Sequence, residues 1–97
     1  MEWEHFELRR KIDDLVYKFS RKLRSDGKIG YIRFDMDVWI IYDNEYGWIA
    51  YDEETKSVTG RPWNVLIQNQ NKDHPPEDEW VSKKGAKSYV YELFYTK

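Results

Sequence analysis

The sequence predicts an α+β domain in which one long N-terminal helix packs on an antiparallel sheet of four to six strands. Three observations lead to this prediction. The 97 residues suffice for a single domain, taken as 1–97, and not for two. Apolar residues recur with a roughly 3.6-residue period over about 3–24, as in a helix. Over about 29–96 the period changes to two, which is typical of half-buried strands.

The helix is expected to bury one apolar stripe. Its members stand at helical spacing and are Leu8, Ile12, Leu15, Val16, Phe19 and Leu23. Glu7 and Lys11 add an acid-first pair four residues apart, the order that stabilises a helix. Gly27 follows at a position suited to the left-handed conformation that ends many helices.

The sheet is expected to begin with a half-buried strand over 31–37. The face of this strand that we expect to be buried carries Ile32, Phe34 and Met36. Residues 38–42 are apolar on both faces and predict a central strand. A hairpin loop with Gly47 leads to a returning strand over 48–51. The last strand, over 88–96, places four large side chains on one face: Tyr89, Tyr91, Leu93 and Tyr95.

The segment between these strands is harder to assign. Residues 58–67 predict a short strand that is kinked or bounded at Pro62. Residues 68–79 carry no large apolar side chain, which predicts a long exposed loop. Loops of this length in compact domains tend to be either functional or disordered.

Composition excludes several classes of protein. The chain has no cysteine, so it can form neither disulfides nor thiolate metal sites. Small secreted domains often depend on disulfides, and their absence favours a reducing, cytoplasmic setting. The longest apolar run is far shorter than the about 18–20 residues of a membrane helix, so we expect no membrane association.

The residue types of catalytic sites are sparse. The two histidines, His5 and His74, supply neither a hydrolytic triad nor a zinc site. The five glycines are isolated and form no phosphate-binding loop. We therefore predict binding rather than catalysis, with no catalytic residue, no cofactor and no metal.

One arrangement keeps a metal-dependent nuclease as a remote alternative. Asp35 and Asp37 could hold a divalent cation, with Glu54 and Lys56 completing a loosely nuclease-like set. Patterns this short arise by chance in a chain that is 35% charged. The simpler interpretation is that these residues face solvent at the ends of strands.

Charge is segregated along the chain. Residues 9–33 contain nine basic and three acidic residues, whereas 34–54 contain seven acidic and no basic residues. Carboxylates interleaved with aromatic rings suit a basic protein partner, because charge speeds encounter and buried rings supply affinity. We predict a non-enzymatic inhibitor, immunity or adaptor protein. Its binding surface would comprise Asp43, Glu45, Tyr46, Trp48, Tyr51, Asp52, Glu53 and Trp80.

The alternative function is binding of nucleic acid or a nucleotide. Basic residues of the predicted helix could neutralise phosphates, and exposed Tyr or Trp rings could stack on bases. These basic residues are Arg10, Lys18, Arg21 and Arg24. A net charge of −2 and a pI near 5.7 weigh against this alternative. A homodimer paired through an exposed sheet edge is a further alternative.

Overall fold

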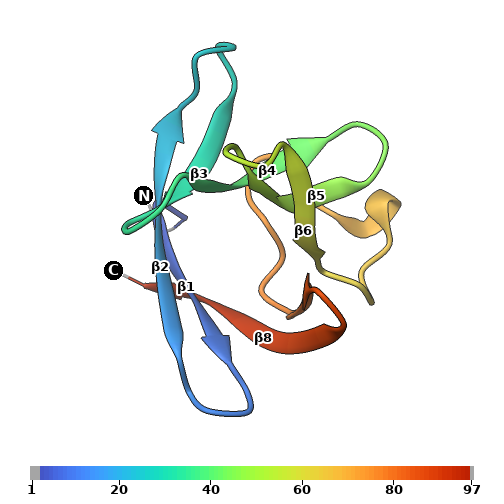
Figure 1. The fold of residues 1–97 in the computed structure, drawn as a ribbon. Coiled ribbons are helices and arrows are strands. Elements are labelled where there is room, and N and C mark those ends of the chain that lie inside the picture. Colours follow the sequence, from blue (N-terminus) through green and yellow to red (C-terminus); the bar gives the residue numbers. More distant parts are fainter. Residues whose placement is uncertain (1–2, 97) are drawn as a thin grey trace.

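The computed structural model describes residues 3–96 and shows a β-barrel. Eight antiparallel strands follow one another in chain order, and the last pairs with the first, which closes the sheet (Figure 1). The strands are β1 (His5–Arg10), β2 (Val16–Leu23), β3 (Ile29–Arg33), β4 (Val38–Asp43), β5 (Gly47–Asp52), β6 (Ser57–Arg61), β7 (Glu79–Lys84) and β8 (Lys87–Thr96). The described residues contain a single helical element, the 3-10 turn η1 (Ile67–Asn69).

The predicted α+β class and the helix over 3–24 are wrong, because this segment is the hairpin of β1 and β2. Four of the six members of the expected helical stripe are exposed: Ile12 at 81%, Leu23 at 62%, Leu15 at 39% and Val16 at 37%. The segment instead follows a period of two, in which Phe6 and Phe19 are register partners and both are buried. Phe6, Val16, Tyr17 and Phe19 on these strands are residue types that fit a pleated, half-buried surface.

The inner face of the barrel is filled mainly by rings. The core cluster comprises Phe6, Leu8, Phe19, Tyr31, Ile40, Trp48, Ala50, Trp80, Tyr91 and Leu93. The ring centroids of Phe6 and Phe19 lie 5.1 Å apart, and those of Phe6 and Tyr31 lie 4.8 Å apart. An eight-stranded barrel has an interior just wide enough for such side chains or for one small ligand.

The third strand buries the opposite face from the one expected. Tyr31 is fully buried on β3, whereas Phe34 is 68% exposed and Met36 is 49% exposed. The strand ends at Arg33, so Phe34 and Met36 lie in the loop to β4. The polar hydroxyl of Tyr31 can lie inside the barrel because it donates a hydrogen bond to the carbonyl of Trp3 at 2.5 Å.

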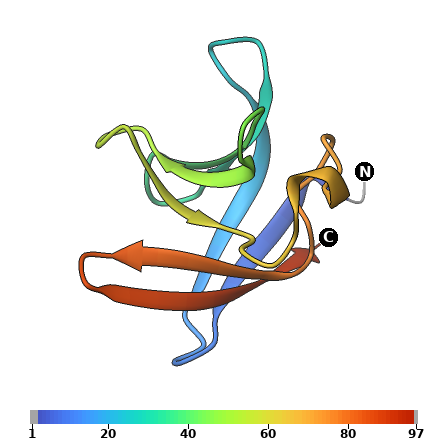
Figure 2. The same cartoon turned by 90° about the vertical axis from the view of Figure 1, so that its right-hand side faces the viewer.

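One end of the barrel is covered by residues 62–78, which we call the capping segment (Figure 2). The indole nitrogen of Trp48 donates to the carbonyl of Asn71 at 2.6 Å, and the hydroxyl of Tyr95 donates to that of Pro75. The expected loop over 68–79 is exposed along much of its length, but Pro75 is fully buried. We call this covered end the closed end and the opposite one the open end.

Candidate functional site

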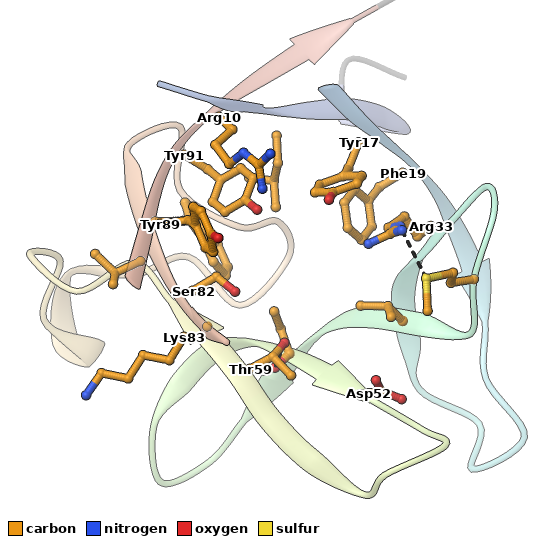
Figure 3. A pocket seen from close by; sticks show the side chains of 17 residues that line it. Arg10, Tyr17, Phe19, Arg33, Asp52, Thr59, Ser82, Lys83, Tyr89 and Tyr91 are labelled. Atoms are coloured by element: carbon orange, nitrogen blue, oxygen red, sulfur yellow. Dashed lines mark hydrogen bonds between the residues drawn. The ribbon is translucent and has the colours of Figure 1, made fainter. Parts of the chain in front are cut away.

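A cavity of about 200 Å³ lies inside the barrel at the open end (Figure 3). Its walls include side chains from all eight strands, so its shape depends on closure of the sheet. A cavity of about 150 Å³ in another protein is known to hold benzene. This space, the mouth cavity, therefore has room for a ligand of about one substituted ring.

The side chains that point from the strands into the barrel become more polar toward the open end. On β1 the inward side chains pass from Phe6 and Leu8 to Arg10, and on β5 they pass from Trp48 through Ala50 to Asp52. The residues on one wall, formed by β5, β6 and β7, are also small. Ala50, Thr59 and Ser82 have short side chains, and Gly60 has none. Small side chains opposite large rings leave the cavity unfilled.

Arginines and tyrosines alternate along the other wall. The guanidinium carbon of Arg33 lies 3.9 Å from the ring centroid of Tyr17, and that of Arg10 lies 4.6 Å from the ring centroid of Tyr89. The rings of Tyr17 and Tyr91 connect the two arginines, with centroids 5.9 Å apart. We call these five residues the arginine–tyrosine arc, and Figure 3 shows them around the cavity. Cations lying on rings in this way are held in place by the ring quadrupole.

The pKa of the Tyr91 phenol reflects its position in the arc. Burial raises this pKa, and the weaker opposing effect is a hydrogen bond with Arg10, which lowers it. The guanidinium of Arg10 thus faces a buried hydroxyl. The arc presents charged and hydroxyl groups together at the cavity wall.

Each arginine of the arc is anchored from outside by an aspartate. Arg10 bonds to Asp13 through Nε at 2.8 Å and Nη2 at 2.5 Å, and Arg33 bonds to Asp35 through Nε at 2.5 Å and Nη2 at 3.1 Å. The side chains of Arg10 and Arg33 are only 18% and 14% exposed. The hydrogen bond from Arg10 lowers the pKa of Asp13 to about 2, and Arg33 lowers that of Asp35. Both carboxylates therefore stay ionised and hold the guanidinium groups in position.

The residues predicted to bind a protein partner do not form one surface. Trp48 and Trp80 are 1% and 2% exposed and belong to the core. Asp43 and Glu45 lie at the β4–β5 turn, and Tyr46 in that turn is 45% exposed. This turn stands at the closed end of the barrel.

The other predicted partner-binding residues lie elsewhere. Tyr51 is partly exposed, and Asp52, next to it on β5, lines the mouth cavity. Glu53 follows in the next turn, where its carboxylate pairs with Arg24 and, at 3.3 Å, with Lys56. The bonds from Arg24, and then from Lys56, lower the pKa of Glu53. The residues of the predicted partner-binding surface therefore lie partly at the closed end and partly at the open end of the barrel, toward opposite ends of β5.

The predicted nucleic-acid residues are also dispersed, because the helix on which they depended is a hairpin. Arg10 lines the mouth cavity, whereas Lys18 is exposed on β2. Arg21 and Arg24 border a groove near the closed end. The guanidinium carbon of Arg24 also lies 4.7 Å from the ring centroid of Trp39, which places this arginine in structural contacts.

The remote nuclease set is divided between two loops. Asp35 pairs with Arg33, and Asp37 accepts a hydrogen bond from the indole of Trp39 at 2.8 Å. Glu54 and Lys56 lie in the β5–β6 turn. Across residues 3–96, no group of three or more His, Cys, Asp or Glu side chains could hold a metal ion.

Sequence reasoning missed Tyr17, Arg33, Tyr89 and Tyr91 as members of a site. The signal that could have found Tyr17 is the alternation over 16–23, which places Tyr17 and Phe19 on one face if the segment is a strand. The same rule places Tyr31 and Arg33 together on β3.

Comparison with protein-family models, with curated proteins and with solved structures found no match for this chain. Of the elements described between residues 3 and 96, none is a helix that has the length and apolar character to cross a membrane. The function of the protein is therefore inferred from the geometry of the barrel itself.

Proposed function

We propose that this protein is a non-enzymatic binding protein for a small organic molecule, which it holds in the mouth cavity. The observation that carries this proposal is a cavity of about 200 Å³ with apolar walls and a few convergent polar groups. This combination is typical of ligand sites, and eight-stranded barrels can hold one small ligand. The absence of cysteine supports a reducing, cytoplasmic setting for this binding.

The walls of the mouth cavity supply both affinity and orientation. Tyr17, Val38 and Tyr89 line the cavity and are partly exposed, so a ligand can cover their apolar surface, which stabilises the complex by removing that area from water. Thr59 and Ser82 present hydroxyl groups on the facing wall, and the arginines present guanidinium groups (Figure 3). The barrel is pre-formed, so binding does not require ordering of a flexible site.

Filling the mouth cavity tests this proposal. We expect a screen of single-ring fragments by ligand-observed NMR to find ligands for the wild-type protein. Ser82→Phe should weaken them at least about tenfold, because the new ring occupies their space. Ser88→Phe is the matched control, since Ser88 is exposed on the adjacent strand. The proposal fails if no fragment binds the wild-type protein, or if Ser82→Phe, shown to be folded by thermal melting, binds them equally well.

Protein binding is a second candidate, supported by the acidic turn at the closed end. Asp43, Glu45 and Tyr46 remain together there, and Tyr46 is 45% exposed. A basic partner captured from host lysate should associate more slowly with the variant Asp43→Lys plus Glu45→Lys at low salt. The matched variant Asp14→Lys plus Glu54→Lys, at two exposed turn positions of the open end, should retain the wild-type rate. Equal rates for both double variants would exclude the acidic turn as the contact.

A further inference from the structure

Two guanidinium groups and one carboxylate face the mouth cavity. The basic side chains are Arg10 and Arg33, the acid is Asp52, and Lys83 points away from the cavity (Figure 3). The carboxylate of Asp52 accepts hydrogen bonds from the backbone N–H of Glu54 at 2.9 Å and of Thr55 at 3.3 Å. Its charge is therefore partly satisfied by the β5–β6 turn.

The acids that pair with the arginines do not line the cavity. Asp13 and Asp35 are 47% and 63% exposed, so each binds its arginine from the solvent side and offsets part of its charge. The guanidinium groups of Arg10 and Arg33 are largely buried beside rings, where charge interacts more strongly than in water. The two aspartates bind Nε and Nη2 of each arginine, and Nη2 of Arg33 also donates to Sδ of Met36 at 3.1 Å, so the further N–H donors of Arg33 are those of Nη1.

The remaining lining is apolar and close to these charges. Val38 and Met36 provide surface for a hydrophobic body, and Tyr17 and Tyr91 provide ring faces between the two arginines. A ligand that matches both features has a compact apolar body and one anionic group. A guanidinium group binds a carboxylate through charge-assisted hydrogen bonds, which the N–H groups of Nη1 can donate here.

We infer that the mouth cavity selects a small organic monocarboxylate, with its carboxylate bound at Arg33 and attracted also by the charge of Arg10, and its apolar body against Tyr17 and Val38. This inference rests on the proposed function, because it names the class of ligand for the same cavity. Arg33 is the stronger contributor, since its side chain is the less exposed of the two and its guanidinium lies directly against Tyr17.

Three isosteric probes separate the sign of the charge from the shape of the ligand. Benzoate, benzamide and benzamidinium are planar molecules of equal size that carry negative, neutral and positive groups. Titration of each into the full chain should show benzoate binding at least about tenfold more tightly than benzamide, with benzamidinium weakest. Arg33→Gln should abolish most of the preference for benzoate and leave the affinity for benzamide within about twofold.

Arg61→Gln is the matched control, because Arg61 is exposed at the other end of the barrel, where its guanidinium carbon lies 5.5 Å from the ring centroid of Tyr46. It should bind all three probes as the wild-type protein does. Equal binding of the three probes would overturn the carboxylate inference and leave the ligand-binding proposal standing. Binding of none would overturn both. A preference for benzoate that survives both Arg33→Gln and Arg10→Gln would overturn the assignment of the arginines.

Discussion

Replacing Trp48 by alanine is expected to destabilise the protein by about 3–5 kcal/mol, measured by urea unfolding. The side chain is 1% exposed, and its ring meets the edges of Tyr31 and Tyr42 at centroid distances of 6.0 and 5.7 Å. Truncation leaves a cavity and removes the hydrogen bond to the carbonyl of Asn71. Domains of this size are stable by only about 5–15 kcal/mol, so the variant should be close to unfolding.

Trp63→Ala is the control for this experiment, because Trp63 is 61% exposed. Its free energy of unfolding should stay within about 0.5 kcal/mol of the wild-type value. A fully stable Trp48→Ala variant that loses capture of a protein partner would contradict the core assignment. That result would return Trp48 to the partner-binding surface that the sequence predicts.

The second large effect is expected for Gly47→Ala, which should lower the free energy of unfolding by about 2–4 kcal/mol. Gly47 has a φ of 80°, and a Cβ there would lie 2.5 Å from Oε1 of Gln70. That side chain cannot move freely, because Oε1 accepts from the backbone N–H of Trp48 at 2.8 Å and Nε2 donates to the carbonyl of Val65 at 2.9 Å. The substitution therefore strains the backbone and also displaces the capping segment.

Gly27→Ala isolates the strain alone. Gly27 has a φ of 85°, and a Cβ there would have no atom within 4 Å. Unfolding in urea should show a cost of about 1–2 kcal/mol for this variant, clearly below that of Gly47→Ala. Adding Gln70→Ala to Gly47→Ala should cost less than the two single changes together, because the clash is already relieved. Equal costs for the two glycines would mean that the capping segment does not dock on the barrel.

Much of the sheet could be predicted from local patterns, whereas the first quarter of the chain could not. The hairpin of β4 and β5 and the shared inner face of Tyr89, Tyr91 and Leu93 are confirmed. The helix failed because a helical stripe and a two-residue alternation both fit the segment around Leu8 and Phe19. The segment becomes a strand because β1 pairs with β8, which lies about eighty residues further along the chain.

The site was less predictable than the fold, because it is created by closure of the barrel. From the sequence, Trp48 and Trp80 could lie either on a binding surface or in the core. Closure of the sheet places both of them in the core. The mouth cavity depends on small residues such as Ala50 and Ser82 facing Tyr17 and Arg33 across the barrel. No spacing along the chain encodes that juxtaposition.

The central claim is that the open end of the barrel binds a small molecule. The most direct test is a titration with benzoate followed in ¹H–¹⁵N correlation spectra of the full chain. The claim predicts that shift changes gather at the backbone amides of Arg10, Tyr17, Arg33 and Tyr89, which surround the mouth cavity. Changes confined to the capping segment or to the β4–β5 turn would contradict it, and so would the absence of any change on addition of benzoate and of its neutral analogue benzamide.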